Sequence, residues 1–327
     1  MRKTTLLGGL LLLMLLSFAL ISAQDDGPNI ALFLPLSNNE YVRNAELGVQ
    51  NILDANGASL TVFAPPTFNF EEQLNQLQDA ITTGGFDAFI FYPADGVGAV
   101  VAADMAAEAG IPMIALDAAI NEDRHTLVPY ENIAAQIART GDGDGSQIGQ
   151  AIVMACEGID PCEVVFQIGF ENFPLDLDRF NAVQDVVSKH ANIQIVSNQP
   201  GAYTQDQGYI VAVDQFQANP GVDVFASVGD QMTLGAEIAA EDAGLDIKLI
   251  GQGASQDGYQ AVAEGRFFAT VANIPYTNGQ IAAQMALQVL DGTLLVRSVN
   301  MYDQAPPFPA SGPIITQDNY EDFEPQW

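Results

Sequence analysis

The sequence predicts an α/β protein built from two doubly wound, Rossmann-like lobes in series. Strand and helix patterns alternate along most of the chain, and the alternation occurs twice, which is typical of parallel sheets covered on both faces. The 327 residues exceed what one ordinary core holds and suit two domains. Hydrophobic residues make up 48% of the chain, enough for two packed interiors. Several strands are expected to cross a hinge between the lobes.

The first lobe is predicted from short β-branched or aromatic runs that alternate with longer amphipathic ones. Asn39 follows the first run as an N-cap, and Gly57 ends the helix that begins there. A glycine pair, residues 84–85, ends the second helix in the same way. The predicted strands are 30–34, 60–63, 88–92 and 112–116, and the predicted helices are 40–55, 70–82 and 96–109.

The same alternation returns after residue 162 and predicts the second lobe. Its predicted strands are 163–168, 193–197, 222–227, 248–250 and 267–271, and its helices are 177–190, 205–217, 231–243 and 256–264. A further helix is predicted at 277–290. The segment after Ala272 is expected to return to the first lobe. The tail from Gln304, rich in proline and acids, is expected to wrap the surface with a last strand at 314–316. The predicted lobes are residues 24–130 with 273–302, and residues 131–272 with 303–327.

Residues 1–23 have the three-part pattern of a cleaved secretory signal. Arg2 and Lys3 precede an apolar run over residues 6–21, and a small-residue cleavage pattern ends at Ala23. A membrane anchor is the alternative, but the run is short for a span of roughly 20 residues. No cysteine lies near the cleavage position, so no lipid anchor is predicted. We therefore expect a periplasmic or secreted protein.

The charge balance argues against several classes of partner. The chain has 41 acidic and 10 basic residues, a net charge of −31. Such a surface repels nucleic acid phosphates and anionic lipids, so neither nucleic acid nor a membrane surface is an expected partner. The acids are scattered rather than clustered, which favours a role in solubility.

Two short segments could form a disulfide or a metal site. Cys156 and Cys162 are the only cysteines, and in an exported chain such a nearby pair predicts a disulfide. A zinc site would need more soft ligands. Residues 140–146 (TGDGDGS) resemble a calcium loop only in part, because Ser146 and Gln147 depart from its pattern. We expect a flexible loop there, and no metal or cofactor.

The motifs of catalysis are incomplete. Residues 253–257 (GASQD) lack the last glycine of a nucleophile elbow, and residues 251–253 (GQG) lack the third glycine of a dinucleotide loop. His125 and His190 are the only histidines, and they lie far apart. Carboxylates are abundant, so counting alone does not exclude a two-acid glycosidase, although its usual barrel differs from a two-lobe repeat. A binding protein without catalytic residues is predicted.

Parallel α/β sheets bind ligands outside the carboxyl ends of their strands. The residues that follow the predicted strands are amides, acids, an arginine and aromatics, at 38–41, 93–95, 117, 170–179, 199–203, 229–230 and 252–253. Carboxylates, amides and guanidinium groups form hydrogen bonds with hydroxyl groups, and aromatic faces cover the apolar side of a sugar ring. The pattern therefore favours a small polar ligand, with a sugar as the best fit.

With these segments in place, the chain resembles the ribose- and galactose-type (type I) periplasmic sugar-binding proteins of bacterial ABC transporters. The resemblance covers nearly the whole chain after the signal, and rests on residues 31–50, 92–95, 110–117, 199–200, 229–235 and 250–251. It implies a monomer whose two lobes close on a sugar. It also implies delivery of the sugar to an ABC permease, with no cofactor.

The resemblance also implies a set of site residues. By position, the family's binding residues fall on Asn39, Tyr41, Asp117, Arg179, Tyr203 and Asn273. By that analogy Asp117 accepts two ligand hydroxyls and Arg179 donates to ring or hydroxyl oxygens. The two asparagines would bridge to the ligand, and the two tyrosines would form aromatic walls. Asn273, Tyr130 and Tyr302 would lie near hinge crossings.

Three positions depart from the family's pattern. Ala118 stands where an arginine usually follows the strand-end acid, Gly229 replaces an asparagine, and Gly253 replaces an acid. Three polar contacts of a ribose-like pocket are therefore absent, which changes the expected specificity but not the expected fold. A larger or less hydroxylated ligand would fill the space beside the two glycines.

The sequence leaves alternatives open. Asp117 and Asn39 could serve as caps, Arg179 could form a surface ion pair, and Tyr41 and Tyr203 could be core aromatics. The chain could also be a sensor of the same fold that feeds a membrane receptor, or a secreted carbohydrate-active enzyme.

Overall fold

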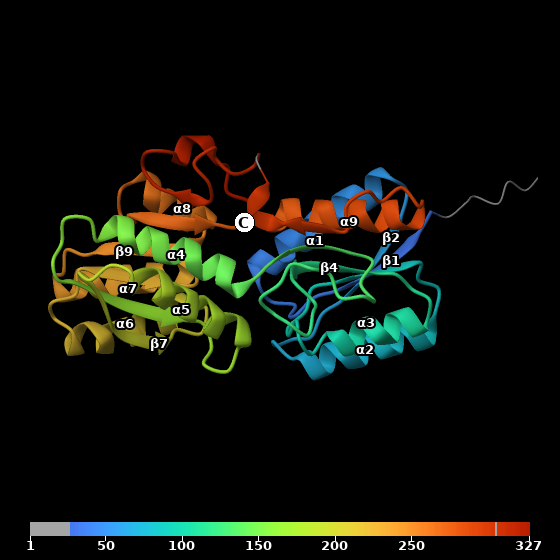
Figure 1. Cartoon of the computed structure of the whole chain (residues 1–327), viewed down its shortest axis with the longest axis horizontal. Coiled ribbons are helices and arrows are strands. Elements are labelled where there is room, and N and C mark those ends of the chain that lie inside the picture. Colours follow the sequence, from blue (N-terminus) through green and yellow to red (C-terminus); the bar gives the residue numbers. More distant parts are fainter. Residues whose placement is uncertain (1–26, 305) are drawn as a thin grey trace, which may run out of the picture.

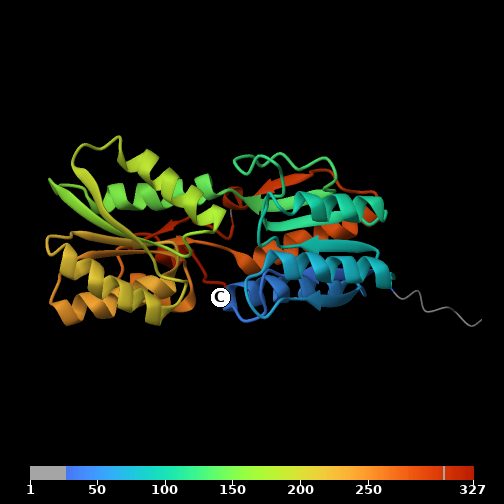
Figure 2. The same cartoon turned by 90° about the horizontal axis from the view of Figure 1, so that it is seen from below.

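The computed structural model describes residues 27–304 and 306–327 and contains two α/β lobes that lie end to end (Figures 1 and 2). Within these residues, each lobe holds one six-stranded sheet, with strand orders β11-β5-β4-β3-β1-β2 and β12-β10-β9-β8-β6-β7. All strand pairs are parallel except β10 with β12. The predicted fold class is therefore confirmed, whereas the predicted signal segment lies outside the described residues.

The first lobe contains strands β1 to β5 and β11. Its strands are β1 (Asn29–Phe33), β2 (Ser59–Phe63), β3 (Ala88–Phe91), β4 (Met113–Ala118), β5 (Ala135–Arg139) and β11 (Ser298–Asn300). Its helices are α1 (Glu40–Ala55), α2 (Phe70–Thr83), α3 (Val100–Glu108) and α9 (Pro275–Leu290). Alternate side chains of the central strands pack against α1 and α9 on one face, and against α2 and α3 on the other.

The second lobe repeats this arrangement. Its strands are β6 (Cys162–Ile168), β7 (Ile193–Pro200), β8 (Val224–Ser227), β9 (Lys248–Gly253), β10 (Ala269–Ala272) and β12 (Ile314–Ile315). Its helices are α4 (Gly141–Ala155), α5 (Pro174–Val187), α6 (Gln205–Ala218), α7 (Asp230–Ala243) and α8 (Gln256–Ala263). Short 3₁₀ turns span Met301–Asp303 and Tyr320–Asp322. The predicted disulfide is present and joins Cys156, after α4, to Cys162, which begins β6.

The glycine-rich segment 140–146 is a helix start, so the prediction of a flexible loop is wrong. Thr140 caps α4 by accepting a hydrogen bond from the Gly143 amide at 3.2 Å. A Cβ at Gly145 would lie 2.1 Å from the carbonyl oxygen of Arg179, so glycine lets α4 approach α5 closely. The described residues contain no cluster of three or more His, Cys, Asp or Glu side chains suited to a metal ion.

A strand that the pattern does not predict, β5, changes the first lobe boundary. β5 pairs with β4, so residues 135–139 belong to the first sheet and the chain changes lobes at Thr140 rather than after residue 130. Tyr130 therefore precedes β5 and lies away from the crossing. The other two crossings fall beside Asn273, between β10 and α9, and just after Tyr302.

No described helix combines the length and the apolar composition that crossing a bilayer requires.

Candidate ligand-binding cleft

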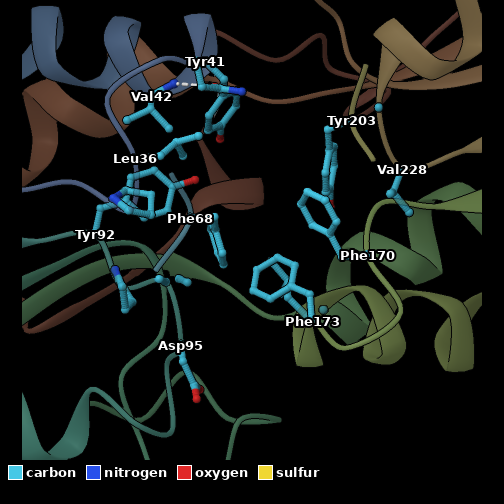
Figure 3. A pocket seen from close by; sticks show the side chains of 18 of the residues that line it. Leu36, Tyr41, Val42, Phe68, Tyr92, Asp95, Phe170, Phe173, Tyr203 and Val228 are labelled. Carbon is cyan, nitrogen blue, oxygen red and sulfur yellow. Dashed lines mark hydrogen bonds between the residues drawn. The ribbon is translucent and has the colours of Figure 1, made fainter. Parts of the chain in front are cut away.

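A cavity of about 420 Å³ lies between the lobes (Figure 3). Its walls come from segments that follow β1 to β5 in the first lobe, and β6 to β10 in the second. The carboxyl ends of both sheets therefore meet at this cavity, where ligands of such sheets bind. Its size is within the range of about 300–1,000 Å³ that is usual for small-molecule sites.

Aromatic side chains face one another across the cavity. Figure 3 shows Tyr41, Tyr92 and Phe68 of the first lobe opposite Phe170, Phe173 and Tyr203 of the second. Phe68 and Phe173 meet across the cleft with their ring centroids 4.9 Å apart. Phe170 packs on Tyr203, with ring centroids 5.5 Å apart. The two lobes therefore touch at the cleft, and aromatic surface lines the space that they enclose.

A buried network of charges joins the two lobes behind these rings. Arg139 and Arg179 both contact Asp144 Oδ2, from Arg139 Nη1 at 2.6 Å and Arg179 Nε at 2.7 Å. Arg139 also contacts Asp117 at 3.0 Å, and Arg179 contacts Asp176 at 2.9 Å. All five side chains are buried. The hydroxyls of Tyr41, Tyr203 and Tyr302 also donate to the carboxyl oxygens of this network.

Electrostatic interactions within the network shift the pKa values of Asp144 and Arg179. Burial alone would raise the pKa of Asp144, but Arg139, Arg179 and the Tyr302 hydroxyl outweigh burial and lower that pKa. Tyr302 donates to Asp144 Oδ1 at 2.6 Å. Burial opposes the charge on Arg179, yet Tyr203 and Asp144 raise its pKa above the ordinary value. The guanidinium groups therefore stay charged and fixed in position, which suits them to donate hydrogen bonds to a bound molecule.

The structure brings five of the six predicted site residues to the cavity wall: Asn39, Tyr41, Arg179, Tyr203 and Asn273. Asn39 Oδ1 caps α1 by accepting from the Val42 amide at 3.0 Å, so this residue both caps a helix and lines the cavity. Arg179 is buried in the charge network and does not form a surface ion pair. Asn273 Oδ1 lies 3.3 Å from the Tyr302 hydroxyl oxygen, which donates mainly to Asp144.

Tyr203 is positioned by a glycine and an acid. A Cβ at Gly169 would lie 1.8 Å from the Tyr203 ring, so only glycine leaves room for that ring. The Tyr203 hydroxyl donates to Asp176 and accepts from Arg179 Nη1, the latter at 2.8 Å. The phenol is therefore locked against the charge network, and its ring faces the cavity.

Asp117 is not among the residues that line the cavity. Its two carboxylate oxygens are engaged by protein donors, Oδ1 by the Tyr41 hydroxyl at 2.5 Å and Oδ2 by Arg139 at 3.0 Å. Direct contact of Asp117 with two ligand hydroxyls stays a prediction. In the described geometry Asp117 lies behind the wall and orients Tyr41 and Arg139, which do line the cavity.

Arg139 is a cavity residue that the sequence interpretation missed. It ends β5, and the register of β4 with β5 pairs it directly with Ala118. Ala118, where the resemblance implies an arginine, therefore lies beside an arginine that ends the neighbouring strand. A basic residue ending the short run 135–139, just before a Thr cap, is the signal that could have revealed it.

Unusual backbone conformations gather at the cleft. Among the described residues, four non-glycine residues have positive φ: Asp117 (69°), Ala202 (52°), Tyr203 (55°) and Ala254 (47°). All four lie at or just after the carboxyl ends of strands that face the cavity. Such conformations cost free energy and persist where the surrounding structure enforces them, which is common at binding sites.

Comparison with known proteins agrees with this architecture. The chain matches the periplasmic binding protein domain over residues 30–294, and it belongs to this family of binding proteins. It is 29% identical to the ribose import binding protein of Salmonella typhimurium, over 80% of this chain and 85% of that protein. It is 25% identical to a xylitol-binding protein of Mycolicibacterium smegmatis, over 86% of this chain and 76% of that protein.

A solved structure shows the same fold. The periplasmic binding component of the arabinose ABC transporter of Shewanella sp. ANA-3, bound to L-arabinofuranose, aligns with a TM-score of 0.76 at 23% identity. The alignment covers 90% of this chain and 93% of that one. The type I periplasmic binding protein fold, with two lobes around a cleft, is thereby established for this chain.

Proposed function

We propose that the protein captures a monosaccharide or a closely related polyol in the cleft, unaltered, and delivers it to the permease of an ABC transporter. The observation that carries the proposal is the interlobe cavity of about 420 Å³, where fixed guanidinium groups lie beside aromatic faces. Guanidinium and amide donors suit hydroxyl oxygens, and aromatic faces suit the C–H side of a sugar. The named ligands of the relatives, ribose and xylitol, have this chemistry.

Capture would depend on closure of the lobes. A ligand that touches both lobes has its full set of contacts only in the closed form, so it shifts the population toward that form. Contacts across the cleft support such a state. Besides the Phe68–Phe173 pair, an ion pair joins Arg124 of the first lobe to Asp178 of α5, with Arg124 Nε 2.7 Å from Asp178 Oδ2. A permease could then recognise the loaded protein by its closed shape.

Export to the periplasm or the cell exterior is part of the proposal. The basic start, the apolar run and the cleavage pattern ending at Ala23 support it, as does membership of a periplasmic family.

A binding screen tests the proposed function. D-ribose, L-arabinose, D-allose and xylitol are added to the purified protein, and the melting temperature and calorimetric heat are measured. A true ligand raises the apparent stability by about 2.7 kcal/mol at a concentration one hundred times its dissociation constant. The bound sugar is then released and identified by mass spectrometry, and recovery of the unchanged molecule is expected.

A variant that fills the cavity locates the binding site. Ala118 lines the cavity, and Ala118→Leu is expected to abolish the ligand-induced rise in melting temperature while the variant stays folded. Ala218→Leu, at the exposed end of α6, adds the same side chain outside the cleft and should bind normally. If none of these sugars or polyols binds, or if a reaction product appears, the proposed function is wrong.

A further inference from the structure

Trp327 belongs to the cavity although it lies far along the chain from the other lining residues. Its ring stands edge-on to Tyr41 of the first lobe, with ring centroids 5.3 Å apart. Its indole Nε1 donates a hydrogen bond to the carbonyl oxygen of Gly253 in the second lobe at 2.9 Å. Figures 1 and 2 mark this end of the chain between the lobes. One side chain therefore touches both lobes at the cavity wall.

The indole of Trp327 occupies space that is free because residue 253 is a glycine. A Cβ on Gly253 would lie 2.3 Å from Trp327 Cζ2, so any side chain there would displace the ring. The backbone φ of +126° at Gly253 also favours glycine. The sequence suggests that a larger ligand fills the room beside this glycine, whereas the structure fills that room with the protein's own indole.

The segment that carries Trp327 is held by both lobes. Phe323 is buried and packs near Tyr259 of α8 in the second lobe, with ring centroids 6.4 Å apart. The Gln326 side chain accepts from the Thr277 amide at 3.0 Å and donates to the Thr277 hydroxyl at 2.7 Å, in the first turn of α9. These contacts fix the position of the indole beside the hinge.

We propose that Trp327 contacts the ligand and determines specificity, because its apolar indole surface covers C–H groups of a cyclic monosaccharide. The inference rests on the proposed function and narrows it to a ligand class, a sugar ring rather than an open-chain polyol. A ring offers one contiguous C–H surface to an aromatic side chain. An extended polyol spreads its C–H groups along a flexible chain and gains less from such a surface.

The test compares two substitutions at one position. D-ribose, L-arabinose and xylitol are titrated calorimetrically into the wild type, Trp327→Ala and Trp327→Phe. Trp327→Ala is expected to weaken binding of the preferred cyclic sugar by about tenfold or more, and to weaken xylitol binding by no more than about threefold. Trp327→Phe keeps an aromatic surface and is expected to retain most of the affinity. Circular dichroism confirms that each variant is folded.

The fluorescence of the wild type gives a readout that needs no variant. Trp327 is the single tryptophan in the sequence, so its emission is expected to change as sugar saturates the cleft. Wild-type affinity in a folded Trp327→Ala variant overturns the inference while leaving sugar binding in place. If that variant does not fold, an emission unchanged at saturating sugar overturns it instead. If no sugar binds the wild type, the proposed function and this inference fail together.

Discussion

Asp230 is a buried acid that lies outside the cavity wall and links three elements of the second lobe. It begins α7 and accepts hydrogen bonds from the Thr270 hydroxyl at 2.7 Å, the Ser255 amide at 2.7 Å and the Ser255 hydroxyl at 3.0 Å. Burial raises the pKa of Asp230 to about 6, although these hydrogen bonds act in the opposite direction. The folded protein therefore binds a proton at this carboxyl more tightly than the unfolded chain does.

This raised pKa predicts a specific pH dependence. The stability that protonated Asp230 contributes is fully present below the unfolded pKa, about 3.9, and is lost as the pH rises through about 6. Between these limits, the free energy of unfolding of the wild type is expected to fall by about 3 kcal/mol relative to Asp230→Asn. Urea titrations across this pH range measure the difference. Asp257→Asn, at an exposed site on α8, controls for the loss of one charge. A constant difference between wild type and Asp230→Asn would contradict the expectation.

The site residues that the sequence could predict lie in the segments that follow strands or in the helices that begin there. Tyr203 and Asn273 lie within three residues of a strand end, whereas Arg179 lies in α5 and was identified through the family resemblance. Arg139 and Trp327 were missed for a different reason. Arg139 depends on recognising β5, and Trp327 meets Gly253 only through the path of the whole tail. Which donor satisfies a given buried carboxylate is likewise decided by three-dimensional contacts, as Asp117 shows.

At the scale of elements, α4 shows why local sequence preference failed. Glycine is a poor helix former, so the glycines of segment 140–146 indicate a loop. In the structure Gly141, Gly145 and Gly149 lie at four-residue spacing on the face of α4 that packs on α5. A Cβ at Gly149 would lie 2.7 Å from the Val186 side chain. Close packing of α4 on α5 outweighs the low helix propensity of glycine. The spacing of the glycines in the sequence does not by itself reveal that contact.

Two glycines of α4 should therefore respond to alanine in opposite directions. Gly145→Ala places a methyl group 2.1 Å from the Arg179 carbonyl oxygen and is expected to destabilise the protein by about 1–3 kcal/mol. A Cβ added at Gly143 would lie 3.5 Å from its nearest neighbour, Thr140 Oγ1, which is an ordinary contact distance. Gly143→Ala is therefore expected to stabilise the protein by about 0.5–1 kcal/mol. Urea unfolding of both variants measures the change. A Gly145→Ala variant as stable as the wild type would mean that α4 does not pack closely on α5 through this face.

At the scale of the whole molecule, the lobes are coupled by two layers of contacts. The buried layer is the charge network, in which Asp144 of the second lobe joins Arg139 of the first. The outer layer lies at the cleft, where Phe68 meets Phe173 and Arg124 meets Asp178. The buried layer adjoins the crossing at Thr140 and can persist while the lobes rotate. The Phe68–Phe173 contact of the outer layer spans the cleft itself, so opening the cleft must break it.

The aromatic pair at the cleft should consequently slow the escape of a bound sugar. An aromatic pair contributes about 0.5–1.5 kcal/mol beyond its buried area, which corresponds to roughly a twofold to tenfold change in the closed population. Phe68→Ala and Phe173→Ala are each expected to raise the ligand dissociation rate by that factor, measured by stopped-flow displacement. The two rings contact each other, with centroids 4.9 Å apart, so either substitution removes the same contact. The ligand should therefore dissociate from the double variant no faster than from the faster single variant. Additive effects would show instead that each ring contacts the sugar independently, and the Phe68–Phe173 contact would then have no part in holding the cleft closed.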